Sequence, residues 1–394
     1  MEESTGGQPA VVPAGWTPEA ASRGAVAAID LDALRANLAR CRELTGDAAV
    51  MAVVKADAYG HGLVPCARAA LEGGASWLGT ALLGEAIALR DAGVGGRVLA
   101  WLAVPGAPWA DCLVRDVDVS VSALWALDEV CAAARATGAR ARVHLKADTG
   151  LSRNGATPDD WPELVAAARV AELEGLVQVT GLWSHFATAD IPTDPSVTSQ
   201  LAVFDEALAI ASAAGLDPEV RHLANSAGAL GVPRSRHDLV RVGIAMYGLS
   251  PGPDIGSAAE LGLRPVMTLK ARLASVKRVA AGSGISYGHT YVTDRDTNVA
   301  LVPLGYADGL PRSAANVGPL HAAGADRTIA GRVCMDQVVV DLGDDVAAVG
   351  DEVVLFGQGG PSADDWAAAC GTIGYEIVTR IGPRVPRVAL GVTS

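Results

Sequence analysis

The spacing of hydrophobic and polar positions divides the chain into two regions of different pattern. Through the first region, short apolar and β-branched runs alternate with Ala- and Leu-rich segments of helical period, separated by Gly, Pro or Asp. Strands are predicted at residues 25–31, 50–56, 77–82, 98–102, 117–121, 141–146, 177–184, 220–224 and 240–246. The clearest helices are predicted at residues 31–44, 64–71, 122–137 and 196–214, with Asp30 as the N-cap of the first.

This alternation predicts a (β/α)8 barrel. Eight of the strands, beginning with residues 50–56, alternate with helices, which is the order of a TIM-like barrel. A doubly wound α/β sheet is the alternative, but it needs a Gly-rich phosphate loop after its first strand. Residues 58–62, Ala-Tyr-Gly-His-Gly, lack the G-x-G-x-x-G spacing of that loop.

Beyond about residue 261 the pattern becomes mostly β. Strands are predicted at 268–279, 298–304, 328–333, 338–342 and 352–356, and the only good helical stretch is 362–369. The first residues, up to about residue 22, are rich in Gly, Pro, Ala and acidic residues. We therefore predict an α/β protein with a flexible tail at residues 1–22, a barrel at 23–261 and a mostly β domain at 262–394.

Composition narrows the function classes. The chain has 394 residues, of which 50% are hydrophobic, and its formal net charge of -13 argues against a nucleic-acid-binding protein. It has no apolar stretch long enough to cross a bilayer and does not start with a secretory signal, so we expect a cytoplasmic protein with no membrane partner. The cysteines form no C-x-x-C pair, and no metal site is expected.

Lysine is scarce, and its positions point to chemistry. Among 31 basic residues the only lysines are Lys55, Lys146, Lys270 and Lys277. Lys55 ends an apolar strand, and a desolvated lysine can lose its proton and attack a carbonyl, which arginine does not do. The alternative is a lysine at a strand end that only extends into solvent.

Further polar residues fall at the ends of the predicted strands. In a barrel these ends share one mouth, where the chemistry of the fold takes place. They hold Lys146, Asp148, His185, Asn225, Ser226, Arg241 and Gly243. A reactive lysine among hydrogen-bonding groups, without metal-ligand spacing, favours a Schiff base with pyridoxal phosphate. Backbone N–H groups near Asn225 and Gly243 are candidate donors to its phosphate, although loop residues are polar in any barrel.

The motifs resemble those of the alanine racemase family. Residues 52–62, Ala-Val-Val-Lys-Ala-Asp-Ala-Tyr-Gly-His-Gly, are similar to the pyridoxal-phosphate signature of that family. The match continues at residues 144–150, 184–190, 224–226, 241–248, 286–288, 305–309, 332–337 and 375–376. The resemblance implies a pyridoxal 5'-phosphate-dependent isomerase that interconverts L-alanine and D-alanine for peptidoglycan. It also implies a homodimer with shared active sites, and a first strand that joins the C-terminal domain.

The resemblance further implies two catalytic bases. Lys55 would hold the cofactor and take the proton from the D isomer, while Tyr287 of the partner subunit would take it from the L isomer. Because a free tyrosine has a pKa of about 10, cationic neighbours must favour its phenolate, and His185 and Arg241 are the candidates. Arg241 would also face the pyridine nitrogen, where an arginine disfavours ring protonation and transamination.

The remaining roles follow from matched motif positions. Arg153 would contact the phenolic oxygen of the cofactor and the substrate carboxylate, and Lys146 matches a lysine that is often carbamylated. The implied cofactor-binding residues are Lys55, Tyr59, Arg153, His185, Asn225, Ser226, Arg241, Gly243, Ile244 and Tyr375. Substrate contacts are Arg153, Met335 and Tyr306, and the entrance corridor holds Asp190, Tyr306, Arg312 and Arg332.

Other readings stay open on sequence alone. Tyr287 would otherwise be a packed aromatic residue, Arg241 half of a buried ion pair, and the corridor arginines interface residues. A decarboxylase of basic amino acids shares the barrel and the lysine motif, but it uses an acidic residue at the pyridine nitrogen. A non-catalytic pyridoxal-phosphate carrier would lack the β domain. A racemase that also accepts serine or another small amino acid is the third alternative.

Overall fold

A computed structural model describes residues 16–391, which fold into two compact units. The first unit spans residues 31–266, and the second joins the residues up to 30 to those from 267 onward.

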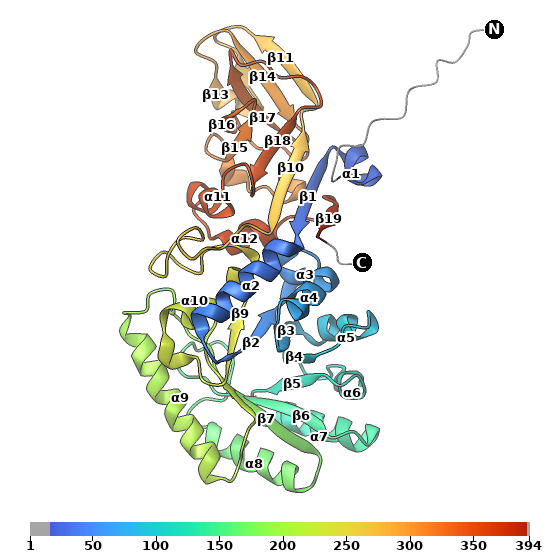
Figure 1. Cartoon of the computed structure of the whole chain (residues 1–394), viewed down its shortest axis with the longest axis vertical. Helices are drawn as coiled ribbons and strands as arrows, with labels where there is room; N and C mark the ends of the chain where they lie inside the picture. The colour runs from blue at the N-terminus through green and yellow to red at the C-terminus, as the bar shows by residue number, and fades with distance from the viewer. Residues whose placement is uncertain (1–15, 392–394) are drawn as a thin grey trace, which may run out of the picture. The chain divides into compact units, whose positions relative to one another are not determined.

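The first unit is a nearly closed barrel of eight parallel strands surrounded by helices (Figure 1). Its strands are β2 (Ala49–Val53), β3 (Trp77–Leu82), β4 (Arg97–Leu102), β5 (Asp118–Val121), β6 (Ala141–Lys146), β7 (Val177–Trp183), β8 (Val220–His222) and β9 (Leu239–Val242). The main helices between and around them are α2 (Leu31–Thr45), α4 (Leu63–Glu72), α5 (Leu83–Asp91), α6 (Trp109–Val114), α7 (Leu124–Thr137), α8 (Trp161–Leu173) and α9 (Pro195–Ala213).

The barrel closes at a seam between β8 and β9, the two ends of the sheet order. The backbone N–H of Asp238 donates to the carbonyl of Arg221 at 3.2 Å, and that of Arg241 donates to the carbonyl of Ala224 at 3.0 Å. These bonds bring the residues that follow β8 beside β9.

Apolar side chains fill one layer of the barrel interior. A buried cluster contributed by five strands consists of Met51, Trp77, Leu99, Val220 and Leu239. Fully burying a side chain of this kind contributes roughly 1.5–3 kcal/mol. Two glycines make room for neighbouring rings, because an added Cβ would lie 2.6 Å from the Trp101 ring at Gly79 and 2.1 Å from His144 Nδ1 at Gly181.

The second unit consists mostly of β-sheet. A six-stranded sheet has the order β16-β15-β18-β10-β1-β19, a three-stranded sheet the order β11-β14-β17, and β12 pairs with β13. The bounds are β1 (Ala25–Asp30), β10 (Met267–Arg272), β11 (Ser275–Val279), β12 (Gly284–Ile285), β13 (Tyr291–Val292), β14 (Thr297–Val302), β15 (Pro319–Ala322), β16 (Ala325–Thr328), β17 (Val338–Gly343), β18 (Glu352–Phe356) and β19 (Arg387–Leu390). The predicted fold class, a (β/α)8 barrel followed by a mostly β domain, is confirmed.

Several elements of the second unit differ from the sequence-based prediction. The tail predicted through residue 22 lies largely outside the described residues, but residues 18–23 form helix α1 (Pro18–Arg23), capped by the Thr17 side chain. The strand predicted at 268–279 is divided into β10 and β11, and the one predicted at 328–333 ends at Thr328 in β16. Besides the predicted helix, which is α11 (Ala363–Cys370), a second helix α12 (Gly374–Thr379) is present.

Candidate functional site

Lys55 follows the end of β2 by one residue, Val54, and stands at the start of a left-handed backbone turn. In α3 (Lys55–Gly60) the residues 56–59 have φ angles of 54°, 53°, 53° and 54°, in the left-handed region. This conformation costs residues with a side chain roughly 1–2 kcal/mol each, so other contacts must hold it. The backbone N–H of Ala56 donates to Glu85 Oε1 at 2.6 Å, and the N–H of Leu63 donates to Asp57 Oδ1 at 2.7 Å.

Glu85 joins the Lys55 turn to the end of the next strand. Its second oxygen, Oε2, accepts from the N–H groups of Ala81 and Leu82 at 3.0 Å each, where α5 begins. The carboxylate therefore holds two chain segments beside Lys55, and we identify it as a positioning residue that the sequence pattern did not reveal.

Four cations gather at the carboxyl ends of the barrel strands. Burial, followed by the charges of Arg153 and Arg241, lowers the pKa of the Lys55 amine, while Glu85 opposes the shift. Burial and the same two arginines lower the pKa of Lys146 to about 7. The Lys146 Nζ lies 4.4 Å from the centre of the Trp183 ring, and the Arg241 guanidinium lies 4.9 Å from it. The pKa of Lys146 thus lies near neutral pH, and the pKa of Lys55 is shifted in the same direction.

Arg241 is buried in β9 and bonds to neutral acceptors. Its Nη1 donates to the carbonyl and the Nδ1 of His222, both at 3.1 Å. Its Nη2 donates to the Ser184 carbonyl and to His185 Nδ1, both at 2.9 Å, and to the Leu223 carbonyl at 3.1 Å. These five bonds use only the terminal nitrogens, so none of them engages the Nε–H.

The surroundings of His185 correct one expectation. Burial, then the charges of Arg241 and Arg153, lower the pKa of His185 well below its usual value. Its Nδ1 accepts from Arg241 and is therefore unprotonated. His185 is a neutral imidazole at neutral pH, so it is not the cation that we expected to favour a phenolate.

A cluster of hydrogen-bonding groups lies where two short helices begin. Asn225 caps α10 (Ser226–Gly231) by accepting from the Gly228 N–H at 2.9 Å, and the Gly243 N–H donates to Ser226 Oγ at 2.9 Å. Gly243 directly precedes the single turn η2 (Ile244–Tyr247). A Cβ on Gly243 would lie only 2.4 Å from Tyr59 Oη, so the absent side chain is what lets Tyr59 approach.

These groups fit pyridoxal phosphate. N–H groups in the first turn of a helix lack intrahelical acceptors and favour phosphate, and the Tyr59 and Ser226 hydroxyls stand beside two such turns. Lys55 offers an amine of lowered pKa, and Arg241 offers an N–H donor. Among residues 16–391 no group of three or more His, Cys, Asp or Glu side chains could hold a metal ion.

The other predicted site residues lie in the second unit, apart from Asp190, which packs against Gly252 in the barrel unit. The 71% exposed Tyr287 begins the turn η3 (Tyr287–His289). Backbone and side-chain contacts bring Tyr287, Tyr306, Arg332 and Met335 into one region. Arg312 begins η5 (Arg312–Ala314), and Tyr375 lies in α12.

Sequence reasoning missed a second set of buried residues behind the site. Trp183 stacks on His222 with a centroid distance of 5.5 Å and an interplanar angle of 7°. His222 in turn contacts His144, which stands in the motif that contains Lys146. Alternating polar positions on the predicted strands were the available signal.

No helix of the part of the chain that the structure describes is long and apolar enough to cross a membrane.

Comparisons with known proteins agree over nearly the whole chain. The family profile "Alanine racemase, N-terminal domain" matches residues 29–251, and "Alanine racemase, C-terminal domain" matches residues 266–389. The alanine racemase of Frankia casuarinae is 60% identical over 364 residues, covering 92% of this chain and 95% of its own. That of Thermobifida fusca is 55% identical over 370 residues, covering 93% and 98%. The crystal structure of alanine racemase from D-cycloserine-producing Streptomyces lavendulae superposes with a TM-score of 0.93 at 59% identity, covering 94% of this chain and 97% of that one.

Proposed function

This chain belongs to the alanine racemase family, and from that premise we propose that it interconverts L-alanine and D-alanine with pyridoxal 5'-phosphate as cofactor. The observation that carries the proposal is the set of cations around Lys55. Burial, Arg153 and Arg241 favour a neutral Lys55 amine, which is the form that can bond to the cofactor and accept a proton. When bound, pyridoxal phosphate supplies a ring that withdraws electron density from the substrate Cα.

The residues of this chain divide the remaining work. Lys55 exchanges the Cα proton on one face of the substrate, and the Arg153 guanidinium binds the substrate carboxylate. The Arg241 Nε–H would donate to the ring nitrogen, and Tyr59, Ser226, Gly243 and Ile244 would hold the phosphate, with Asn225 beside them. The family resemblance assigns Tyr375 to the phosphate as well. Because Lys146 has a pKa of about 7, part of it is a neutral amine at neutral pH, which carbamylation by carbon dioxide requires.

We further propose that the active enzyme is a homodimer. Tyr287 is largely exposed within its own unit, so it is available to reach the site of a second copy. There, Tyr287 of the partner subunit would exchange the Cα proton on the face opposite Lys55. Met335 would donate a backbone N–H to the substrate carboxylate, and Tyr306 would narrow the corridor lined by Asp190, Arg312 and Arg332, which limits substrate size.

The alternatives are less well supported. A decarboxylase would carry an acidic residue at the ring nitrogen, whereas the residue that we propose for this position is Arg241, whose five bonds are to imidazoles and carbonyls. A carrier of barrel-only architecture would lack the domain at residues 266–389. A supply of D-alanine for peptidoglycan and a cytoplasmic location stay predictions.

Deuterium exchange tests the proposed function. The purified enzyme, supplied with pyridoxal phosphate, is mixed with L-alanine, D-alanine or L-serine in deuterated buffer, and Cα deuteration and chirality are followed. We expect rapid Cα exchange with formation of the opposite alanine isomer, and slower or no turnover of serine. Lys55→Ala should abolish both, whereas Lys270→Ala, whose side chain pairs with Glu352 on a β-sheet, should retain them. Release of carbon dioxide, or absence of Cα exchange, would contradict the proposal.

A further inference from the structure

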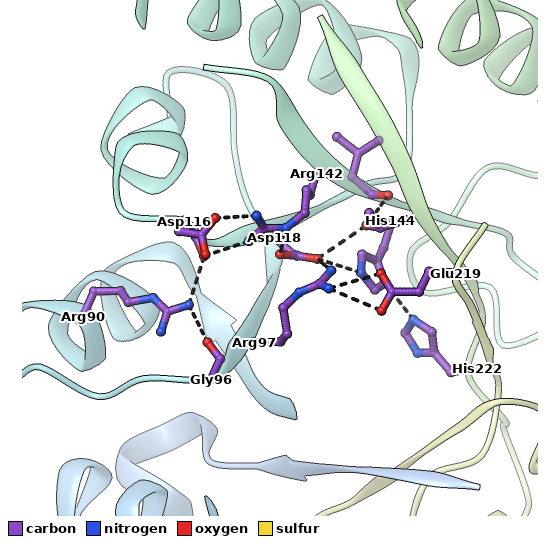
Figure 2. Close-up of polar contacts among 11 residues, drawn as sticks. Arg90, Gly96, Arg97, Asp116, Asp118, Arg142, His144, Glu219 and His222 are labelled. Carbon is purple, nitrogen blue, oxygen red and sulfur yellow. Dashed lines mark hydrogen bonds and ion pairs between the residues drawn. The ribbon is translucent and has the colours of Figure 1, made fainter. Parts of the chain in front are cut away.

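A continuous line of buried polar groups runs from Arg241 through His222 and His144 to Asp118. Figure 2 shows the part of this line from His222 to Asp118. His222 Nε2 lies 2.9 Å from His144 Nδ1, and His144 Nε2 lies 3.3 Å from Asp118 Oδ2. The side chains of both histidines and of Asp118 are fully buried, and they come from the strands β8, β6 and β5. This line forms only if the registers of β5 with β6, β6 with β7 and β7 with β8 bring these side chains together.

Hydrogen-bond chemistry fixes the direction of every link. An arginine N–H can only donate, so His222 Nδ1 accepts from Arg241 and carries no proton. A neutral His222 then carries its proton on Nε2 and donates to His144 Nδ1. His144 therefore carries its own proton on Nε2 and donates to Asp118. A proton on the other nitrogen of either ring would place two N–H groups face to face.

Asp118 ends the line as a carboxylate. Although burial opposes ionisation, hydrogen bonds from His144 and Arg97 and the charge of Arg142 lower the pKa of Asp118 to about 2. Arg97 Nη2 donates to Oδ2 at 2.8 Å, and Arg142 Nε donates to Oδ1 at 2.7 Å. The same arginines also pair with Glu219 and Asp116, whose side chains are exposed.

We propose that Asp118 and His144 are positioning residues for the racemase site, which act on Arg241 by fixing the tautomer and orientation of His222. The Asp118 carboxylate fixes the proton of His144 on Nε2, and His144 in turn fixes the proton of His222 on Nε2. The unprotonated Nδ1 of His222 then accepts a hydrogen bond from one terminal nitrogen of Arg241. A rigid Arg241 would keep its Nε–H available to the ring nitrogen of the bound cofactor and would disfavour protonation of that nitrogen. Asp118 and His144 thereby contribute to the choice between racemisation and transamination.

The spectroscopic test uses the cofactor-free enzyme labelled with 15N-histidine. In the wild type, both His144 and His222 should show a protonated Nε2 and an unprotonated Nδ1, with slowly exchanging N–H protons. Asp118→Asn should shift the N–H resonances of both rings. The matched controls, Asp116→Asn and Glu219→Gln, remove a carboxylate from the same arginines without touching the line, and they should shift neither.

The kinetic test rests on the proposed function, whereas the spectroscopic test does not. His144→Leu keeps both arginine contacts of Asp118, so it remains testable if Asp118→Asn fails to fold. We expect His144→Leu to lower racemase kcat roughly tenfold, equivalent to about 1.4 kcal/mol. It should also raise the pyruvate formed per racemisation, because alanine then transfers its amino group to the cofactor more often. The controls should change neither.

The outcomes separate the two proposals. Failure of racemisation in the wild type would reject the proposed function and leave the spectroscopic result standing. A wild-type His222 or His144 protonated on Nδ1 would overturn the inference. So would an Asp118→Asn spectrum in which only His144 responds, or pyruvate formation in His144→Leu equal to that of the controls.

Discussion

Replacing Gly243 with alanine tests the phosphate cradle, because the change adds one methyl group beside Tyr59. Gly243 has a negative φ of -112°, so the main cost of alanine is the contact of its Cβ. That atom would lie 2.4 Å from Tyr59 Oη and 3.1 Å from Tyr59 Cζ. Tyr59 is 7% exposed and packs against Tyr247 with ring centroids 4.8 Å apart, so its ring has little room to move.

The expected result is weaker cofactor binding. The displaced Tyr59 hydroxyl would lose the bond to the phosphate that we propose for it, and a hydrogen bond to a charged group is worth about 1.5–3 kcal/mol. The dissociation constant of pyridoxal phosphate should therefore rise roughly ten- to hundredfold. Titrating cofactor-free enzyme and following the absorbance of the Lys55 Schiff base measures it directly.

Two further variants make this experiment decisive. Gly95→Ala adds the same methyl group where no atom lies within 4 Å, and it should leave the dissociation constant unchanged. In the Gly243→Ala background, Tyr59→Phe removes the clashing oxygen, so it should cost less than it does in the wild type. If Gly243→Ala binds the cofactor as tightly as Gly95→Ala does, the reasoning from the Tyr59 contact is refuted.

Three other predictions follow from the site. Tyr287→Phe should mainly disable proton abstraction from L-alanine, as measured by Cα deuterium exchange from each isomer; equal loss in both directions would contradict the two-base assignment. Lys146 has a pKa of 10.5 when unfolded and about 7 when folded, so the unfolded state binds more protons between these values and stability rises with pH there. In carbon dioxide-free buffer, the free energy of unfolding of the wild type should therefore approach that of Lys146→Met as the pH rises from 7 to 10. A difference in free energy of unfolding that stays constant over this range would refute this reasoning. Glu85→Gln should lower the pKa of Lys55 further, as measured by the pH dependence of its chemical modification, and an unchanged profile would dismiss that contribution.

The strand and helix pattern predicted the barrel because parallel strands buried on both faces read as short apolar runs. It did not predict the turn after β2, since residues 50–56 read as one strand. Ala56 and Tyr59 carry no sequence signal for positive φ, and the groups that hold the turn include Glu85, which lies 29 positions away. Local propensity contains no information about such a distant partner.

Candidate residues were predictable where a motif named them, and less so where strands had to be aligned. Asp118 and His222 read as ordinary polar positions on short strands, and only the registers of β5 with β6, β6 with β7 and β7 with β8 bring them to His144. The helix α12 escaped prediction because it begins at Gly374 and contains the β-branched Ile377 and Val378. Tertiary packing overrides weak propensity there.

Arg241 has a structural role at the seam between β8 and β9, in addition to the role that we propose for it at the ring nitrogen. Its terminal nitrogens donate to the carbonyls of Ser184, His222 and Leu223, and so tie the ends of β7 and β8 to β9 where the ladder of the sheet is incomplete. A planar group with several N–H donors can do this, whereas a carboxylate, which only accepts, cannot. A barrel of this kind that carries an acidic residue at the ring nitrogen must therefore close its seam by other means. One side chain thus links the choice of chemistry to the closure of the barrel.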